Sequence, residues 1–259
     1  MPNPWDIGTA MYLRHLGFKA LATTSAGAAF ARGLADSVNG MSRDATLAHI
    51  REIVSATPLP VNADFQSGYA HEPEDLAANV TLCVHTGVAG LSIEDATGDP
   101  SRPLYERGLA IERIRAARAA IDATGVPVVL TARCEAWLVG DATPERTALD
   151  RLVAFADAGA DCLYAPRVRD LKIISSIVKA VSPKPVNVLV SAPGPELSVS
   201  RLADLGVRRI SVGSALACVG WGAFMRAARS IAETNSFDAL AGAVPFSEIN
   251  GFFESKTKK

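Results

Sequence analysis

The chain has 259 residues, of which 49% are hydrophobic and 20% are charged, and its formal net charge at pH 7 is -1. This length and apolar content fit a single domain with a sizeable buried core. A nearly neutral charge without a sustained basic run argues against binding to nucleic acid or to an anionic membrane. Because no signal peptide and no run of about 18 apolar residues is present, we expect a cytoplasmic protein.

Apolar runs and helical stretches alternate along the chain. Seven runs predict buried strands, at residues 18–25, 59–64, 88–95, 126–133, 160–166, 184–191 and 207–214. Stretches with helical periodicity separate them, such as 73–87 and 106–125, the second with acids early and arginines late, as the helix dipole favours. Nearly continuous apolar strands that alternate with helices indicate a parallel sheet covered on both faces.

Seven such repeats favour a (β/α)8 barrel, the TIM barrel of the α/β class, over an open sheet. A helix is expected to begin near Asp6, so only residues 1–4 remain for the first of eight strands, which we expect to be truncated and to leave open edges. We expect the catalytic barrel to occupy residues 1–235. A helical extension should follow at 236–259.

The four cysteines are Cys83, Cys134, Cys162 and Cys218. They lie far apart and have neither the spacing of a zinc site nor that of a disulfide framework, so we expect reduced, buried thiols.

Polar residues close several of the apolar runs. Asp64, Glu94, Asp95 and Arg133 do so, and Thr24, Asn187 and Ser211 lie at or near other run ends. In a barrel of this kind the active site lies at the carboxyl ends of the strands. Carboxylates supply the oxygen ligands that Mg²⁺ prefers, and an arginine can bind a substrate carboxylate through two hydrogen bonds.

Two other kinds of barrel chemistry are disfavoured. No run ends on a lysine, as a Schiff-base aldolase would require. The four histidines, His15, His49, His71 and His85, fall on predicted helices or a loop rather than at strand ends, which argues against a histidine-based metal site.

Five segments carry a family resemblance. LATTSAG, GLAD, VNADFQSGYA, GVAGLSIEDATGD and LTARCEAWL, in this order, resemble the isocitrate lyase/phosphoenolpyruvate mutase superfamily, whose barrels act on α-oxo and α-hydroxy carboxylates with Mg²⁺. The resemblance implies that Asp64 binds Mg²⁺, or Mn²⁺ in its place, and that Asp36 and Glu94 hold metal-bound waters. Gln66 occupies a metal-site position that is commonly acidic in relatives, and strand alternation should point it the same way as Asp64.

The resemblance also implies a substrate site. Backbone amides around Ser25, Ala26 and Gly27 would hold the oxo-acid end of the substrate with help from Arg133, and we place Thr24 and Asn187 in the same site. Asp36, Asp64 and Arg133 are the candidate catalytic residues.

The loop after Asp95 departs from the family pattern. Lyases of the family carry a catalytic cysteine there, and mutases and phosphonopyruvate hydrolases carry lysine with asparagine or threonine. Residues 96–108 contain no Cys, Lys or His and offer only Thr97 and Ser101. The oxaloacetate decarboxylase-like branch therefore fits best: Mg²⁺-dependent carbon–carbon cleavage or decarboxylation of a small α-oxo or α-hydroxy carboxylate through an enolate.

Several alternatives remain open. The chain could perform carbon–phosphorus chemistry of the phosphonopyruvate hydrolase or mutase kind, could resemble 2-methylisocitrate lyase in activity, or could bind oxo acids without turnover. Asp64 could cap a helix, Glu94 and Asp95 could be a solvated pair, and Arg133 could be a structural ion-pair partner.

The tail carries Phe237, Phe246, Phe252 and Phe253, which is more aromatic surface than a solvated end should show. Terminal helices pack on neighbouring subunits in the family that the chain resembles. We therefore expect a homodimer or homotetramer formed through the C-terminal helices.

Overall fold

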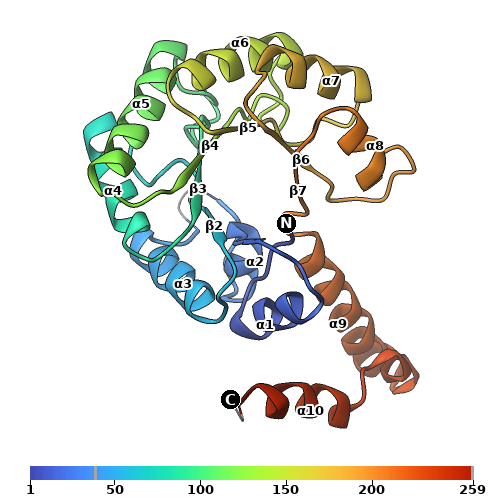
Figure 1. Cartoon of the computed structure of the whole chain (residues 1–259). Helices are drawn as coiled ribbons and strands as arrows, with labels where there is room; N and C mark the ends of the chain where they lie inside the picture. The colour runs from blue at the N-terminus through green and yellow to red at the C-terminus, as the bar shows by residue number, and fades with distance from the viewer. Residues whose placement is uncertain (38–39, 258–259) are drawn as a thin grey trace. The chain divides into compact units, whose positions relative to one another are not determined.

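A computed structural model describes residues 1–37 and 40–257. Seven parallel strands form one sheet in the order β1 to β7, and the sheet curls into a barrel with helices outside it (Figure 1). The strands are β1 Leu21–Ala22, β2 Val61–Asp64, β3 Gly90–Glu94, β4 Val129–Arg133, β5 Cys162–Tyr164, β6 Val186–Leu189 and β7 Arg209–Ser211. Each lies inside one of the predicted runs, so all seven strand predictions and the barrel fold are confirmed.

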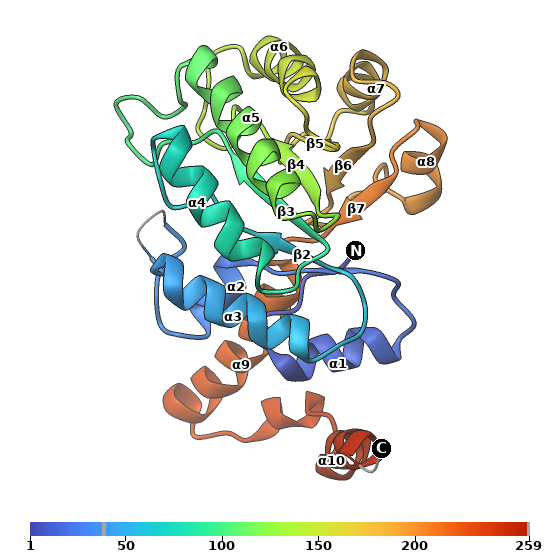
Figure 2. The same ribbon diagram turned by 60° about the vertical axis from the view of Figure 1, so that its left-hand side comes forward.

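One helix precedes β1, and at least one helix follows each strand. The helices are α1 Ile7–His15, α2 Ser25–Phe30, α3 Arg43–Ser55, α4 Pro73–Val84, α5 Arg107–Ala123, α6 Pro144–Asp157, α7 Leu171–Ala180, α8 Val199–Asp204, α9 Ala215–Thr234, η1 Asp238–Gly242 and α10 Phe246–Thr257. Asp6 caps α1 by accepting from the Thr9 amide, as its sequence position predicts. Figure 2 shows α4 and α5 packed side by side outside the sheet.

Residues 1–3 lie between the two edge strands of the sheet. The amide of Ala22, on β1, donates to the Pro2 carbonyl oxygen at 3.0 Å, and the Met1 amine donates to Ile210 O on β7 at 2.7 Å. The Asn3 side chain accepts from two amides just after β7 and donates to the Thr23 carbonyl just after β1. The predicted first strand is therefore not a regular strand in the described chain, and the open edges expected from its truncation are bridged by these hydrogen bonds.

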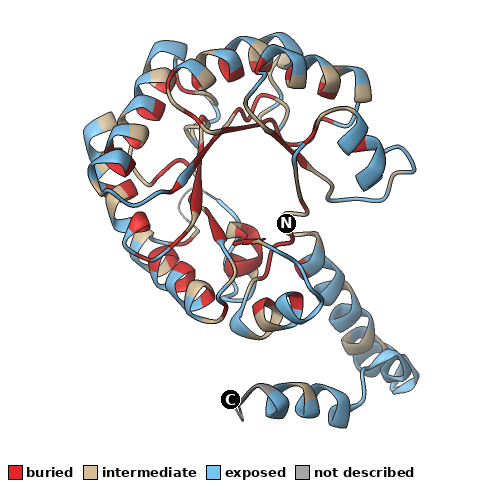
Figure 3. Cartoon of the chain, viewed as in Figure 1, coloured by how far each residue is buried: buried red, intermediate tan, exposed pale blue. Residues whose placement is uncertain are grey.

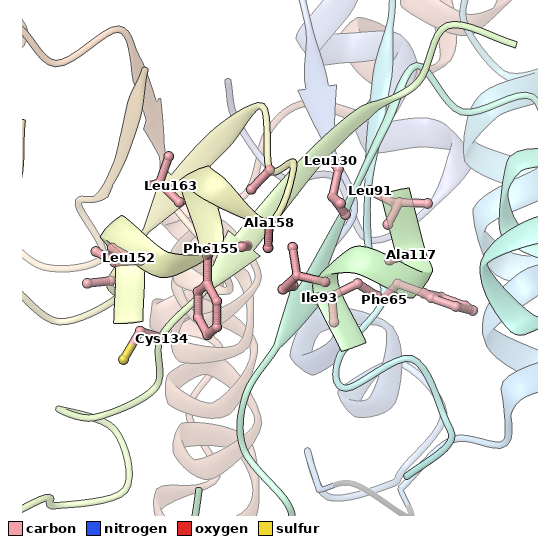
Figure 4. Packing of buried hydrophobic residues seen from close by; sticks show 14 of the residues in the cluster. Phe65, Leu91, Ile93, Ala117, Leu130, Cys134, Leu152, Phe155, Ala158 and Leu163 are labelled. Carbon is pink, nitrogen blue, oxygen red and sulfur yellow. The ribbon is translucent and has the colours of Figure 1, made fainter. Parts of the chain in front are cut away.

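The main apolar core lies between the sheet and the surrounding helices. The helix faces turned toward the sheet are buried and the outer faces are exposed (Figure 3). Phe155 and Leu152 of α6 belong to the same buried cluster as Leu130 and Leu163 of the sheet (Figure 4). Phe155 is 1% exposed, and truncating such a side chain to alanine costs about 3–5 kcal/mol of stability.

The inside of the barrel is unusually polar. Barrel interiors are normally filled by branched apolar side chains, whereas here buried positions on the strands are occupied by Asn62, Ser92, Thr131, Asn187 and Ser211. One row of residues paired in register runs from Glu94, the last residue of β3, through Arg133 and Tyr164 to Asn187 and Arg209, the first residue of β7. The row leads from one end of the strands to the other because barrel strands are tilted.

The chain divides into two compact units, Met1–Leu216 and Ala217–Lys259. The first holds the barrel, and the second holds most of α9 together with η1 and α10.

No helix in the described part of the chain is long and apolar enough to cross a membrane. All four cysteines are free, but Cys218 is exposed and the other three are buried, so the expectation of four buried thiols is wrong for Cys218.

Candidate active site

Three predicted site residues end consecutive strands and meet there. Asp64 ends β2, Glu94 ends β3 and Arg133 ends β4. Nη1 of Arg133 lies 3.0 Å from Asp64 Oδ1 and 2.7 Å from Glu94 Oε1. The three side chains are only 13–17% exposed, so the ion pairs are largely removed from solvent.

Glu135 is a fourth member of this cluster that the sequence analysis missed. Its Oε1 accepts from Nε of Arg133 at 2.9 Å, and its side chain is 4% exposed. Glu135 lies two residues after Arg133, and side chains two residues apart on an extended chain point the same way. This spacing could have identified Glu135 as a site residue. Tyr164, the last residue of β5, was missed too, and its ring lies 4.9 Å from the Arg133 guanidinium carbon.

Asp95 is structural in this arrangement. It is 4% exposed, accepts from the Glu135 amide at 2.7 Å and pairs with Arg151 at 3.0 Å. The reading of Glu94 and Asp95 as a solvated pair is therefore wrong, because both carboxylates have protein partners. Asp95 holds the turn after β4 and thereby fixes the backbone of Glu135.

Asp64 is also tied to the first βα turn. Its amide donates to Thr23 Oγ1 at 2.9 Å, and its Oδ2 accepts from the Ser25 amide at the start of α2. Thr24 caps the same helix by accepting from the Gly27 amide at 3.2 Å. The predicted substrate-binding turn thus lies directly beside Asp64, with the Ser25 and Gly27 amides engaged by these two side chains.

Gln66 reaches the site by a different route from the one that strand alternation predicts. β2 ends at Asp64, and Gln66 has a φ of 50°, so the extended conformation stops before it and the alternation argument is wrong. Gln66 nevertheless lines a small cavity of about 10 Å³ together with Asp36, Asp64 and Ser25. Its Nε2 is 3.5 Å from the Ser37 carbonyl oxygen, whereas its buried Oε1 has no hydrogen-bond partner among the described residues.

The loop that carries Gln66 is built around left-handed backbone conformations. Gly68 has a φ of 80°, and a Cβ there would lie 2.0 Å from Leu76 Cδ1, so only glycine fits. Arg113 of α5 is 1% exposed and donates to the carbonyls of Ser67, Ala70 and His71. This buried arginine fixes the turn that places Gln66 beside Asp64.

The acidic side chains have perturbed proton affinities. Burial raises the pKa of Glu94 well above its ordinary value, and the charges of Glu135 and Asp64 add to this, against the opposing effect of Arg133. Asp36 as a residue is exposed, but partial desolvation of its carboxyl and the Asp64 charge raise its pKa. Burial alone would lower the pKa of Arg133, but its carboxylate neighbours outweigh that effect and raise it. The cluster therefore has more negative charge than Arg133 balances.

This donor set fits a hydrated Mg²⁺ ion. In the part of the chain described, no three His, Cys, Asp or Glu side chains converge as a closed metal site. Mg²⁺ keeps several waters and requires only one or two protein carboxylates. The three carboxylates that share the single cation Arg133 and the unpartnered Gln66 Oε1 are the two features that a cation with bound water would satisfy.

Asn187 is not brought into this cluster. It is 2% exposed, donates to Ser211 Oγ at 2.9 Å and accepts from Arg209 Nε at 3.0 Å. Its amide therefore belongs to the polar interior of the barrel in this structure. His71 pairs with the Tyr105 hydroxyl at 2.7 Å instead of lying against the carboxylates.

The loop after Asp95 is closed on itself. Thr97 Oγ1 donates to the Arg102 carbonyl oxygen, and Ser101 Oγ donates to Asp99 Oδ1 at 2.7 Å. An isolated bridge between Ala96 and Leu104 closes the loop at its base. Both hydroxyls that could have replaced the missing acid or base are thus hydrogen-bonded within the loop.

Comparison with known proteins places this geometry in a family context. The crystal structure of a Burkholderia cenocepacia protein, provisionally assigned as a lyase or mutase, is 46% identical in sequence and matches 98% of this chain and 89% of its own with a TM-score of 0.92. 2-Methylisocitrate lyase of Salmonella typhimurium is 32% identical over 66% of this chain and 60% of the enzyme. Oxaloacetate decarboxylase of Rhodopseudomonas palustris is 31% identical over 58% of this chain and 50% of the enzyme.

The sequence model of the phosphoenolpyruvate phosphomutase family matches residues 1–232. Because this match covers the barrel and all the strand-end carboxylates, the chain belongs to that family, within the isocitrate lyase/phosphoenolpyruvate mutase superfamily of lyases and mutases.

Proposed function

We propose that this protein is a Mg²⁺-dependent carbon–carbon lyase that decarboxylates oxaloacetate or a close α-oxo dicarboxylate. The observation that carries the proposal is the loop after Asp95. It contains no Cys, Lys or His, and its Thr97 and Ser101 hydroxyls are bonded within the loop. Loss of CO2 from oxaloacetate breaks the bond to the carboxylate that is β to the oxo group, and the electron pair remains in an enolate, so no base is needed. A proton from solvent then converts the enolate to pyruvate, which suits a loop without an acid or a base.

The carboxylate cluster supplies the binding features for such a substrate. Asp64, Asp36, Glu94 and Gln66 are the residues that would hold Mg²⁺. When bound there, the ion supplies electrophilic stabilisation of the negative charge that develops on the substrate's oxo group. Manganese could serve in the same place.

Arg133 retains capacity for a substrate carboxylate. Its Nε and Nη1 atoms are used by Glu135, Asp64 and Glu94. Nη2 makes no hydrogen bond among the described residues, and its two N–H groups can donate to an incoming carboxylate. In the turn after β1, the Ser25 and Gly27 amides are engaged by Asp64 and Thr24, so the Ala26 amide would hold the oxo-acid end.

The test is a direct assay of pyruvate formation from oxaloacetate with Mg²⁺ and with a chelator. The expected result is Mg²⁺-dependent turnover that Asp64→Ala abolishes. Asp204→Ala, which changes an exposed acid at the end of α8, is the matched control and should behave as the unchanged protein.

Parallel assays separate the alternatives. Phosphate release from phosphonopyruvate, or its conversion to phosphoenolpyruvate, would favour carbon–phosphorus chemistry. Succinate and pyruvate from 2-methylisocitrate would favour the activity named for the Salmonella relative. Oxaloacetate binding measured by calorimetry without turnover of any of the three would leave an oxo-acid-binding barrel and refute the lyase proposal.

We also propose that the second unit mediates self-association into a homodimer or homotetramer. Phe224, Phe237 and Phe246 are 61%, 66% and 82% exposed. Within the described part of this unit, Ala217 is the one buried residue. So many exposed aromatic side chains are typical of a surface that another protein covers.

A further inference from the structure

Arg151 is a buried arginine whose guanidinium holds both ends of the loop between β3 and α5. It belongs to α6, one of the helices outside the sheet (Figure 1), and it is 8% exposed. Its Nη1 donates to Oδ2 of Asp95 at 3.0 Å, and its Nη2 donates to the carbonyl oxygen of Tyr105 at 2.7 Å. Asp95 directly follows β3, and Tyr105 lies just before α5. One side chain therefore joins the start of this loop to its end.

Tyr105 is itself held firmly, so its carbonyl oxygen is a fixed acceptor for Arg151. Its amide donates to the Asp95 carbonyl oxygen at 2.9 Å, and its hydroxyl pairs with Nδ1 of His71 at 2.7 Å. The guanidinium carbon of Arg113 lies 4.1 Å from the centre of its ring. These contacts place the Tyr105 carbonyl, and that carbonyl in turn fixes the position from which Arg151 reaches Asp95.

Asp95 connects Arg151 to the turn after β4. Its Oδ1 accepts from the Glu135 amide at 2.7 Å, while its Oδ2 pairs with Arg151. Asp95 is 4% exposed, and a carboxylate this deeply buried is unfavourable without a counter-charge. Arg151 supplies that charge and keeps Asp95 an ionised acceptor, which binds the Glu135 amide more strongly than a neutral carboxyl group would.

Glu135 extends the connection to Arg133. Its Oε1 accepts from Nε of Arg133 at 2.9 Å, and the Arg133 carbonyl oxygen accepts from the Asp95 amide at 3.2 Å. Asp64 and Glu94 contact Nη1 of the same guanidinium. The position of Arg133 therefore depends on Glu135, and through Asp95 it depends on a residue of α6.

We propose that Arg151 is a positioning residue for the binding of the substrate carboxylate by Arg133. It contacts neither the substrate nor the metal ion and acts through Asp95 and Glu135. The inference rests on the proposed function, which assigns the substrate carboxylate to Arg133.

Isothermal titration calorimetry with oxalate and Mg²⁺ tests the proposal without turnover, because oxalate resembles the enolate of pyruvate in shape and charge. Arg151→Gln should weaken oxalate binding at least about tenfold. Arg146→Gln changes an exposed arginine of the same helix and should alter the affinity less than about threefold. Circular dichroism confirms that each variant is folded, so that a lower affinity reports on the site. Unchanged oxalate affinity in folded Arg151→Gln would overturn the proposal.

Two further variants test whether the effect passes through Asp95. Arg151→Lys keeps a positive charge beside Asp95 and should hold the oxalate affinity within about threefold of the unchanged protein. A loss as large as that in Arg151→Gln would overturn the proposed path.

Asp95→Asn combined with Arg151→Gln removes both charges together, so it leaves no buried charge unpaired even if Arg151→Gln alone does not fold. The combined variant should lose at least about tenfold in affinity, but no more than the larger of the two single losses, because both substitutions interrupt the same path. Losses that add, or no loss in the combined variant, would overturn the proposal.

Hydrogen exchange without ligand separates a failure of this inference from a failure of the proposed function. The Glu135 amide should exchange faster in the combined variant than in the unchanged protein and in Arg146→Gln. Equal exchange would overturn the role of Arg151. Oxalate binding by an unchanged protein that forms no pyruvate from oxaloacetate would refute decarboxylation alone, whereas a lack of oxalate binding would refute the proposed substrate site and this inference together.

Discussion

Nη1 of Arg133 lies 2.7 Å from Oε1 of Glu94, and the two residues are register partners at the ends of β4 and β3. The same guanidinium also contacts Asp64 and Glu135. One cation therefore serves three largely buried carboxylates, which leaves the cluster with a negative excess and makes it sensitive to any change of charge.

Replacing Arg133 should destabilise the fold strongly. Arg133→Gln leaves the three carboxylates without a cation, and we expect a loss of about 3 kcal/mol in the free energy of unfolding, since breaking a buried ion pair costs about 3–5 kcal/mol and protonation of Glu94 relieves part of it. Arg107→Gln is the control, because its pair with Asp150 is about half exposed and screened by solvent, so its loss should change the free energy of unfolding far less. Urea unfolding in the presence of a chelator measures both, and equal losses would contradict the prediction.

The amide at Gln66 should weaken Mg²⁺ binding relative to an acid. We expect Gln66→Glu to tighten the apparent Mg²⁺ affinity about tenfold, if the restored charge contributes about 1.4 kcal/mol. Asp64→Ala should abolish metal-dependent activity. Titrating activity against Mg²⁺ in the three proteins provides the measurement, and wild-type metal dependence in Asp64→Ala would remove Asp64 from the site.

A second readout of Gln66→Glu does not depend on activity. Without Mg²⁺ the new carboxylate lies near Asp36 and Asp64, so the melting temperature should fall below that of the unchanged protein. Adding Mg²⁺ should raise it more than it raises that of the unchanged protein. Equal Mg²⁺-induced shifts would argue that Gln66 does not face the ion.

His49 should make the fold sensitive to acid. It is 3% exposed, and its Nε2 has no partner among the described residues. Burial and the charge of Arg32 lower the pKa of His49 from its ordinary 6.5. The unfolded chain therefore takes up the proton at higher pH than the folded one, so stability is present above pH 6.5 and is lost as pH falls through the lowered folded value.

His49→Leu should flatten this dependence between about pH 7 and pH 5, because leucine neither titrates nor leaves a polar atom unpaired. His85→Gln, at an exposed position, should leave the slope unchanged. Melting temperatures measured across that pH range test the prediction. If the melting temperature changes with pH equally in His49→Leu and in the unchanged protein, His49 does not cause the acid sensitivity.

Removal of residues 237–259 should shift size-exclusion elution toward the monomer. Phe246→Ser, at a side chain 82% exposed, should give a smaller shift in the same direction. Phe18→Ser changes a 41% exposed phenylalanine of the barrel unit and should not alter elution. Unchanged elution after the deletion would count against association through the tail.

The sequence by itself determined the barrel and the centre of its candidate site. Seven apolar runs separated by helical stretches permit few arrangements other than parallel strands covered by helices. In such a sheet the carboxyl ends of neighbouring strands share one edge. Asp64 and Arg133 each end a run, and Glu94 is the last residue but one of the run between them, so their meeting followed from the strand assignment alone.

The tertiary structure decided which other side chains joined them. The left-handed turn at Gln66, held by Arg113 from a helix more than 40 residues away, replaced the strand alternation that the local sequence indicated. Hydrogen bonds with Ser211 and Arg209 hold the Asn187 side chain in the barrel interior. The bridging of β7 and β1 by residues 1–3 likewise depends on hydrogen bonds between residues about 200 positions apart. These contacts exist only once the sheet has curled and its strands have tilted, because closure sets which residues of distant strands share a level of the barrel.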